Sequence, residues 1–388
     1  MSQPESPPPA SPSLPQQPVD AQRLTRRRKV LFAVAAVLIV FALAEAVLRT
    51  FNFTFALTDL HARFPGAGLA RYSQKHPDWF WELKPLMVMG DDRRGLTYEI
   101  NRLGFRGVRE WLPKKPKDTL RVLCLGDSCT FGLGVKFEDC YTVRLEALLN
   151  APGASQRFEV LNAGSPGYSS YQGWRILEKQ LADFEPDVVT FYFGKNEAEA
   201  AFAYSDKDQN ALRAFRLRAA LDKSRVYQLC SWLVALKLRA VARLRGVPYG
   251  ATDEKTWHEV NRGRRPGLVR VSHDEFVENA RNIIALGRRH GFKVFLLTYP
   301  YATTLNEEEW RKYHPLPLIP AYNTRLRALA EQENVLLVDL QRVLAQRNDP
   351  TLFLKGDPIH PTPKGHDLIA QELLRAVGDG RFTEQQRE

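Results

Sequence analysis

The sequence predicts an α/β domain of three layers, with a parallel β-sheet between two layers of helices, behind an N-terminal membrane helix. Short apolar runs alternate with helical segments from residue 119 onward, and the runs are continuous rather than interrupted by polar residues. Strands that are buried on both faces of a parallel sheet have this pattern. A separate apolar stretch near the N-terminus is long enough to span a bilayer.

The beginning of the chain divides into a polar tail and an apolar helix. Residues 1–22 are rich in Pro, Ser and Gln, so we predict a disordered cytosolic tail over 1–29 that ends in Arg26-Arg27-Arg28-Lys29. Residues 30–48 are apolar except for Glu45, and a helix of this length just spans a hydrocarbon layer of about 30 Å. The basic cluster predicts a cytosolic N-terminus. We therefore expect a single-pass protein of the inner (cytoplasmic) membrane whose remaining chain is extracytoplasmic.

A cleaved signal peptide is the alternative interpretation of the same segment. Ala42-Leu43-Ala44 resembles a signal-peptidase site. Against cleavage, the polar head is unusually long for a signal peptide, and the apolar run continues past the site. These two features favour an uncleaved anchor.

The α/β domain extends over residues 119–378, after an aromatic lead-in at 49–118 that we expect to pack on it and before a short tail at 379–388. The lead-in includes a short edge strand at 96–101. The predicted strands of the domain are 121–126, 158–162, 187–193, 293–299 and 335–340. The predicted helices are 137–150, 169–182, 274–290, 320–333 and 364–376. This βαβ rhythm predicts a parallel sheet with right-handed crossovers.

The segment between the third and fourth strands is far longer than a crossover requires, and we assign about 200–270 to a helical insertion. Residues 201–270 hold 15 Lys/Arg and 6 Asp/Glu, in a chain whose net charge is +11. A surface of this charge suits anionic lipid headgroups or an acidic polymer. A solvated basic face and a cap over the active site are the alternatives. Because no nucleic-acid recognition motif accompanies the charge, we expect no nucleic-acid partner.

Four short polar segments stand at the predicted strand ends or before the last helix. Because the carboxyl ends of parallel strands meet at one edge of a sheet, we expect these segments to converge. They are Gly126-Asp127-Ser128, the glycine-rich loop from Asn162 to Ser169 with Gly167, Gly194-Lys195-Asn196, and Asp357-Pro358-Ile359-His360.

Together these segments contain the groups that acyl transfer requires. The Ser128 hydroxyl is a weak nucleophile until a base removes its proton; His360 can be that base, oriented by Asp357 three residues earlier. Candidate donors for the oxyanion are the backbone N–H groups of Ser128 and Gly167 and the side-chain amide of Asn196. Each residue alone has a simpler explanation, such as a helix cap, a turn or half of a metal site. The joint occurrence of all four segments favours catalysis.

The sequence contains no sign of a metal or cofactor site. Asp357 and His360 have no companion motif that would supply a third metal ligand, so we expect neither a metal nor a cofactor. The four cysteines form no CxxC pair. A bridge between Cys129 and Cys140 is conceivable in an oxidising compartment.

The four segments resemble the motif blocks of the GDSL/SGNH hydrolase superfamily over about 119–378. The resemblance implies a flavodoxin-like sheet of order 2-1-3-4-5, Ser128 as the nucleophile with His360 and Asp357, and an oxyanion hole of Ser128, Gly167 and Asn196. The G-x-S-x-G elbow of the α/β-hydrolases is absent. Two positions depart from the family pattern, because Cys129 follows the serine and Glu197 replaces an aspartate that often follows the asparagine. The anchor and the lead-in resemble a bacterial membrane-anchored branch.

The sequence therefore predicts a membrane-anchored serine esterase that acts outside the cytosol. Its expected substrate is a small acyl ester, and an O-acetyl group on a cell-surface glycan is the candidate we favour. A second hypothesis is an O-acyltransferase that moves the acyl group to a polysaccharide hydroxyl instead of water. A third is a non-catalytic component of an envelope assembly complex, with the basic insertion as the docking face for envelope protein partners.

Overall fold

The computed structural model describes the ranges 25–53, 72–91, 94–199, 205–211, 217, 220–221, 223–244, 269–303 and 318–378. The chain divides into two compact units, Met1–Phe53 and Thr54–Glu388. Residues 1–24 of the predicted tail, the predicted C-terminal tail at 379–388 and much of the insertion lie outside the described residues.

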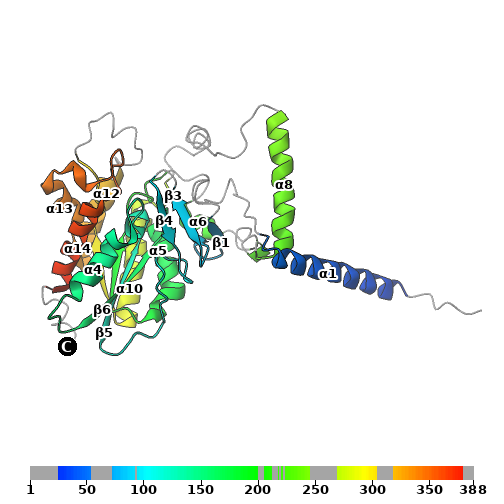
Figure 1. Cartoon of the computed structure of the whole chain (residues 1–388), viewed down its shortest axis with the longest axis horizontal. Coiled ribbons are helices and arrows are strands. Elements are labelled where there is room, and N and C mark those ends of the chain that lie inside the picture. The colour runs from blue at the N-terminus through cyan, green and yellow to red at the C-terminus, as the bar shows by residue number, and fades with distance from the viewer. Residues whose placement is uncertain are drawn as a thin grey trace, which may run out of the picture. The chain divides into compact units, whose positions relative to one another are not determined.

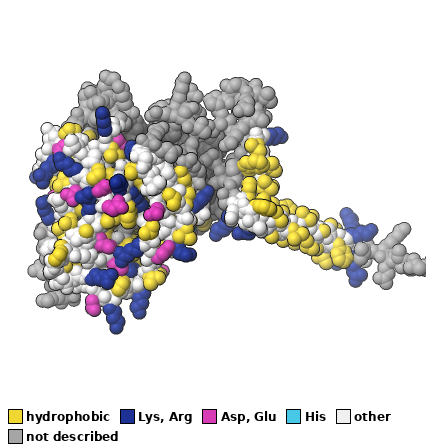
Figure 2. Space-filling model, in the orientation of Figure 1, with side chains coloured by type: hydrophobic (Ala, Val, Ile, Leu, Met, Phe, Trp, Pro, Cys, Tyr) yellow, Lys and Arg dark blue, Asp and Glu magenta, His cyan; other side chains and the backbone are white. Residues whose placement is uncertain are grey.

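The first unit contains one helix, α1 (Arg26–Thr50), which includes the whole predicted apolar segment and begins at the basic cluster (Figure 1). An 18-residue window of α1 has a mean hydropathy of 2.8, and none of that window is buried. Figure 2 shows hydrophobic side chains along α1 and Lys and Arg side chains at its start. Among the described residues, α1 is the one helix long and apolar enough to cross a membrane, a property that a signal sequence shares.

The second unit is built on a five-stranded parallel sheet in the order β6-β5-β7-β8-β9. This order confirms the predicted 2-1-3-4-5 topology. The strands are β5 (Thr119–Gly126), β6 (Arg157–Gly164), β7 (Val188–Tyr192), β8 (Lys293–Leu297) and β9 (Leu336–Val338). Every residue of β7, and every residue of β5 except Leu120, is buried, which explains the continuous apolar runs.

Helices cover both faces of this sheet and form two separate cores (Figure 1). One core contains side chains of α5 (Ser170–Ile176), α10 (His273–His290) and α12 (Ile319–Glu333). The other contains side chains of α4 (Tyr141–Leu149), α13 (Leu340–Arg347) and α14 (Pro363–Gly378). Successive residues of β5 alternate between the two cores, as the pleat of a strand requires.

Helix α13 was not predicted. The fifth strand was predicted to run to residue 340, but β9 ends at Val338, and Leu340 is already the first residue of α13. Asp339 caps this helix by accepting the backbone N–H of Arg342 at 3.3 Å. The apolar run at 335–340 is therefore shared between a short strand and the buried side of a helix.

The aromatic lead-in forms two antiparallel pairs, β1 (Ser73–His76) with β2 (Phe80–Leu83), and β3 (Val88–Asp91) with β4 (Leu96–Glu99). The short edge strand predicted at 96–101 is observed as β4, which ends at Glu99 and pairs with β3 in a separate two-stranded sheet. Trp79, Phe80 and Trp81 are buried in the core that α5 and α10 also line. The lead-in thus packs on the α/β domain through its aromatic residues.

The remaining described elements are short, except for one helix of the insertion. The short elements are α3 (Ser128–Phe131), η1 (Phe137–Asp139), η2 (Leu177–Leu181), η3 (Ala182–Phe184), α6 (Asp206–Ala211) and η5 (Pro350–Leu352). Helix α8 (Arg225–Leu244) lies within the stretch expected to be helical, and it exposes Leu233, Val234 and Leu236.

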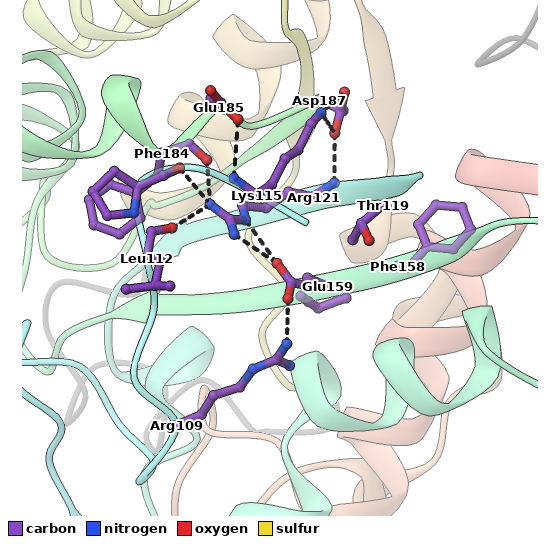
Figure 3. Close-up of polar contacts among 12 residues, drawn as sticks. Arg109, Leu112, Lys115, Thr119, Arg121, Phe158, Glu159, Phe184, Glu185 and Asp187 are labelled. Carbon is purple, nitrogen blue, oxygen red and sulfur yellow. Dashed lines mark hydrogen bonds and ion pairs between the residues drawn. The ribbon is translucent and has the colours of Figure 1, made fainter. Parts of the chain in front are cut away.

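At the amino ends of the strands, Arg121 of β5 holds the lead-in against the sheet (Figure 3). Its side chain is buried and pairs with Glu159 of β6, with 2.8 Å between Nη2 and Oε2. Its Nη1 donates to the carbonyl oxygens of Leu112, Pro113 and Phe184 at 2.9, 3.0 and 2.6 Å. Arg109 binds the other oxygen of Glu159 at 2.6 Å. We call Arg121, Glu159 and Arg109 the amino-edge cluster.

Candidate active site

Ser128 is the first residue of α3, directly after β5 ends at Gly126. Asp127 caps the helix by accepting the backbone N–H of Cys129 at 2.9 Å. A Cβ atom at Gly126 would lie 2.0 Å from Thr130 Oγ1, so only glycine permits this close return of the chain. Strand and helix together leave Ser128 8% exposed at the carboxyl edge of the sheet.

His360 lies on a loop that Asp357 organises. One oxygen of the Asp357 carboxylate, Oδ1, accepts the backbone N–H groups of Ile359 and His360 at 3.2 and 3.1 Å. The other, Oδ2, lies 2.6 Å from Nδ1 of His360. The opposite ring nitrogen, Nε2, lies 2.8 Å from Ser128 Oγ. The structure therefore brings Ser128, His360 and Asp357 into one hydrogen-bonded chain, although the serine is 232 positions away from the histidine.

The electrostatic surroundings of Asp357 keep its carboxylate ionised. Burial raises the pKa of its carboxyl, but the hydrogen bond and the charge of His360 outweigh burial and hold the pKa below its usual value. An ionised carboxylate accepts the proton on Nδ1, which leaves Nε2 of a neutral ring free to accept the proton of a hydroxyl.

The three predicted oxyanion donors differ in whether their N–H groups already have acceptors. The Ser128 and Gly167 backbone N–H groups have no acceptor among the described residues. The Asn196 amide is 4% exposed, and its Nδ2 donates to Tyr168 O at 2.9 Å and to Asp127 Oδ2 at 3.1 Å. Two of the three donors are thus available as they stand, and the third is engaged with the residue that precedes the serine.

Comparison with known proteins identifies the family of this chain. The model of the GDSL-like lipase/acylhydrolase family matches residues 124–368, which include all four blocks. The chain belongs to this family. It is a hydrolase that acts on ester bonds, as the sequence predicts. No curated protein sequence matches it.

Several solved structures resemble this GDSL-like chain. A lipase/acylhydrolase from Enterococcus faecalis is 18% identical with a TM-score of 0.43, over 67% of this chain and 96% of the other. The acetyl xylan esterase AlAXEase is 19% identical with a TM-score of 0.42, over 66% and 100%. The acetylxylan esterase Axe2 from Geobacillus stearothermophilus is 17% identical with a TM-score of 0.41, over 67% and 94%.

Cys129, which follows the serine, lies beneath the site rather than in it. Its Sγ contacts Tyr299 Oη at 3.1 Å and the carbonyl oxygen of Ile359 at 3.3 Å. Burial raises the pKa of the Cys129 thiol well above its usual value. The group is therefore a neutral packing residue, and it forms no bridge to Cys140, because all four cysteines are free.

Asp127 and Tyr299 lie under the nucleophile, and the sequence motifs predict no role for either residue. Asp127 is fully buried, its Oδ2 accepts the Tyr299 hydroxyl at 3.0 Å, and burial raises the pKa of its carboxyl. Tyr299 stands at the end of a predicted strand, 293–299. The rule that selected the other strand ends would therefore have found it.

Arg106 of the lead-in was also missed. It donates to the carbonyl oxygens of Phe131 at 2.9 Å and Val135 at 2.7 Å, and also to that of Gly132. These are the carbonyls at and beyond the end of α3. Arg106 therefore holds the short helix that carries Ser128, and no spacing in the sequence announces that role.

The described residues contain no group of three or more His, Cys, Asp or Glu side chains that would hold a metal ion. A cavity of about 410 Å³ lies at the opposite edge of the sheet, and its lining includes Lys115, Asp187 and His290. None of the four motif blocks lines this cavity.

Proposed function

We propose that this chain is a membrane-anchored serine esterase in which Ser128 is the nucleophile, His360 the general base and Asp357 the residue that orients the base. The observation that carries the proposal is the continuous chain of contacts, 2.8 Å from Ser128 Oγ to His360 Nε2 and 2.6 Å from His360 Nδ1 to Asp357 Oδ2. Both distances are within hydrogen-bonding reach, as nucleophile activation by a base requires.

Acylation begins when Ser128 Oγ attacks the ester carbonyl carbon and His360 Nε2 takes the hydroxyl proton. Asp357 remains ionised and stabilises the imidazolium that forms. The tetrahedral intermediate then collapses, the bond to the leaving oxygen breaks, and His360 returns the proton to the departing alcohol. A water molecule repeats the sequence on the acyl-serine, which releases the carboxylic acid and restores the Ser128 hydroxyl.

The oxyanion of each intermediate would be bound by the N–H groups of Ser128 and Gly167, which have no acceptor among the described residues. Preorganised donors of this kind contribute about 10²- to 10³-fold each to the rate. Asn196 is the third proposed donor. Because its Nδ2 contacts Asp127 in this structure, it must share or release that hydrogen when the oxyanion forms.

The proposed location rests on the composition of α1. The helix is apolar enough to span a bilayer and starts with Arg26, Arg27, Arg28 and Lys29, a charge pattern that favours a cytosolic N-terminus. We therefore propose an uncleaved single-pass anchor in the inner membrane, with the esterase domain on the outer side. The test is protease treatment of spheroplasts. Digestion of the domain while the chain stays in the membrane supports this topology, and a soluble product that lacks residues 1–44 contradicts it.

A small acyl ester on a cell-surface glycan is the substrate that this location favours, with O-acetyl as the candidate acyl group. Hydrolysis and transfer differ in their products. Incubation with an acetylated donor and a glycan acceptor should release only free acetate. An acetylated glycan product would instead identify the chain as an O-acyltransferase.

The nucleophile is tested by Ser128→Ala with p-nitrophenyl acetate as substrate. The variant should fold and lose esterase activity, and it should no longer be labelled by a fluorophosphonate probe. Ser155→Ala, the same change at an exposed serine, should keep both activity and labelling. Esterase activity that survives Ser128→Ala contradicts the mechanism, and an unlabelled wild-type serine favours a non-catalytic role.

A further inference from the structure

The two ends of the 200–270 insertion meet in a buried ion pair beside the glycine-rich loop. Asp206 is the first residue of α6, and Arg270 lies 64 positions later, just before α10. Arg270 is 3% exposed and Asp206 1%. Their side chains make two contacts, 3.2 Å from Nε to Oδ1 and 3.0 Å from Nη2 to Oδ2. We call this pair the insertion clamp.

The two side chains of the clamp also form hydrogen bonds with the loop that carries Gly167 and with the helix that follows it. Arg270 Nη1 donates to the Gly167 carbonyl oxygen at 2.7 Å, and Nη2 donates to Gln172 Oε1 at 2.9 Å. Asp206 Oδ2 accepts the Ser169 hydroxyl at 2.6 Å. Two points on the loop, Gly167 and Ser169, and one residue of the following helix α5, Gln172, therefore bond to two side chains from the ends of the insertion.

Gly167 has a backbone conformation and a free N–H group that make this support important. Its φ is +83°, in the left-handed region, and its N–H has no acceptor among the described residues. On the other side, a Cβ atom at Gly167 would lie 3.5 Å from the Trp81 ring. No hydrogen bond from its own N–H group holds Gly167 in place. The hydrogen bond from Arg270 to the Gly167 carbonyl oxygen therefore restricts rotation of the residue.

Arg270 also connects this loop to the segment that carries Asn196. Its backbone N–H donates to Glu199 O at 2.9 Å, and the next residue, Val271, donates to Glu197 O at 3.3 Å. The two proposed oxyanion donors that do not belong to Ser128 are thus held by one stretch of chain.

We propose that Arg270 and Asp206 are positioning residues that aim the Gly167 N–H at the oxyanion and thereby couple the insertion to catalysis. The inference rests on the proposed serine mechanism. A buried ion pair is seldom the most stable solution, because two well-packed apolar residues often stabilise a fold equally well. What an apolar pair cannot supply is the planar fork of donors that reaches Gly167 and Gln172 together.

The substitution that separates positioning from mere stability is Arg270→Lys, which keeps the charge and removes the fork. The chain offers a matched control in Arg121→Lys. Arg121 is also buried and also paired with a carboxylate, and it donates to backbone carbonyl oxygens as Arg270 does, but it lies at the amino edge of the sheet. A second variant, Arg270→Met with Asp206→Asn, removes both charges together and so leaves no unpaired ion.

The full-length protein is used, and rates are expressed per serine that reacts with a fluorophosphonate. For Arg270→Lys and for the double variant we expect kcat for p-nitrophenyl acetate to fall about 10- to 100-fold, the loss that misplacement of one donor causes. KM should change less than about threefold. The inhibition constant of phenylboronic acid, whose serine adduct places an oxygen in the oxyanion hole, should rise in parallel with the loss in kcat. Arg121→Lys should leave kcat within about twofold of wild type.

Two results overturn the proposal. One is a folded Arg270→Lys and a folded double variant whose kcat and boronate affinity stay within twofold of wild type. The other is an equal loss of kcat in Arg121→Lys, because general loosening of the domain would then explain both. Esterase activity that persists in Ser128→Ala overturns the serine mechanism and the clamp together. An unchanged Arg270→Lys and an unchanged double variant, beside an inactive Ser128→Ala, overturn the clamp alone.

Discussion

Charged side chains are buried at both edges of the sheet, but the two edges differ in how completely these groups are hydrogen-bonded and paired. At the amino edge, every nitrogen of the Arg121 guanidinium is hydrogen-bonded, and both oxygens of Glu159 are paired with arginines. At the carboxyl edge, Asp127 is fully buried without an arginine or lysine bonded to it, and one oxygen of the fully buried Glu197 has no partner among the described residues.

The pKa shifts follow this difference. Burial raises the pKa of Asp127, and it raises that of Glu197 to about 7. Charge that is buried without full compensation costs stability, and it tends to gather where a protein performs chemistry. The pairing at the amino edge is therefore typical of a group that stabilises the fold, and the incomplete pairing at the carboxyl edge is typical of a reaction site. Substitutions at the two edges should separate stability from activity.

The largest expected effect is on activity at the carboxyl edge, in Asp357→Asn. The amide no longer favours the ring form with a proton on Nδ1, so kcat should fall by up to about 10⁴-fold while the protein stays folded. The measurement is p-nitrophenyl acetate turnover per fluorophosphonate-reactive serine. Asp349→Asn, at a carboxylate of the same region that pairs with Lys364 rather than with a histidine, should leave kcat within about twofold. A loss smaller than tenfold in Asp357→Asn would exclude this carboxylate as the partner of His360.

The largest expected effect on stability is at the amino edge, in Arg121→Met. The change leaves the carbonyl oxygens of Leu112, Pro113 and Phe184 without their donor and leaves Glu159 with Arg109 alone. Breaking a buried pair in this way costs about 3–5 kcal/mol. Urea unfolding should show that loss, with kcat per reactive serine unchanged below the transition. A loss under about 1 kcal/mol, or a reduced kcat, would blur the distinction between the edges.

Much of the fold is predictable from the sequence because its signals are local. Strands buried on both faces leave continuous apolar runs, and four of the five predicted strands match observed strands closely. The exception, 335–340, failed because a three-residue strand is followed within two residues by α13. An apolar run that short does not distinguish a strand from the buried side of a helix.

The site is only partly predictable for a different reason. The motif residues follow strand ends, and the topology of a parallel sheet then places them on one edge. Arg106, Arg121 and Arg270 have no such rule, because burial of an arginine depends on carbonyl oxygens supplied by distant segments. Their sequence neighbours give no sign of it. Tertiary contacts alone show that these residues hold α3, the lead-in and the Gly167 loop.

A smaller effect should appear in the pH dependence of stability in Glu197→Gln. Burial raises the pKa of Glu197 to about 7, so the folded protein keeps this proton up to about pH 7, whereas the unfolded chain releases it near the usual glutamate pKa of 4.5. Between these values the folded state binds more protons, so this residue makes wild-type stability fall as pH rises, and its contribution levels off above about pH 7.

Glutamine removes the effect. The variant should gain about 1–3 kcal/mol relative to wild type between pH 5 and 7.5. Denaturant unfolding at several pH values measures this difference, in which the other titrating groups largely cancel. A flat difference would show that Glu197 ionises normally in the folded protein.

The smallest stability effect, and the sharpest comparison, comes from two glycines with almost the same conformation. Gly167 has φ +83° in the glycine-rich loop, and Gly291 has φ +82° at the end of α10. An added Cβ meets only ordinary contact with Trp81 at the first and nothing within 4 Å at the second. Substitution by alanine therefore imposes mainly backbone strain at both, about 1–2 kcal/mol.

Both variants should lose that much in urea unfolding. Only Gly167→Ala should also lose about tenfold in kcat, since a small rotation of this peptide turns its N–H away from the oxyanion. Equal kcat in the two variants would mean that the Gly167 N–H contributes nothing to the reaction, and the oxyanion would then be left to Ser128 and Asn196.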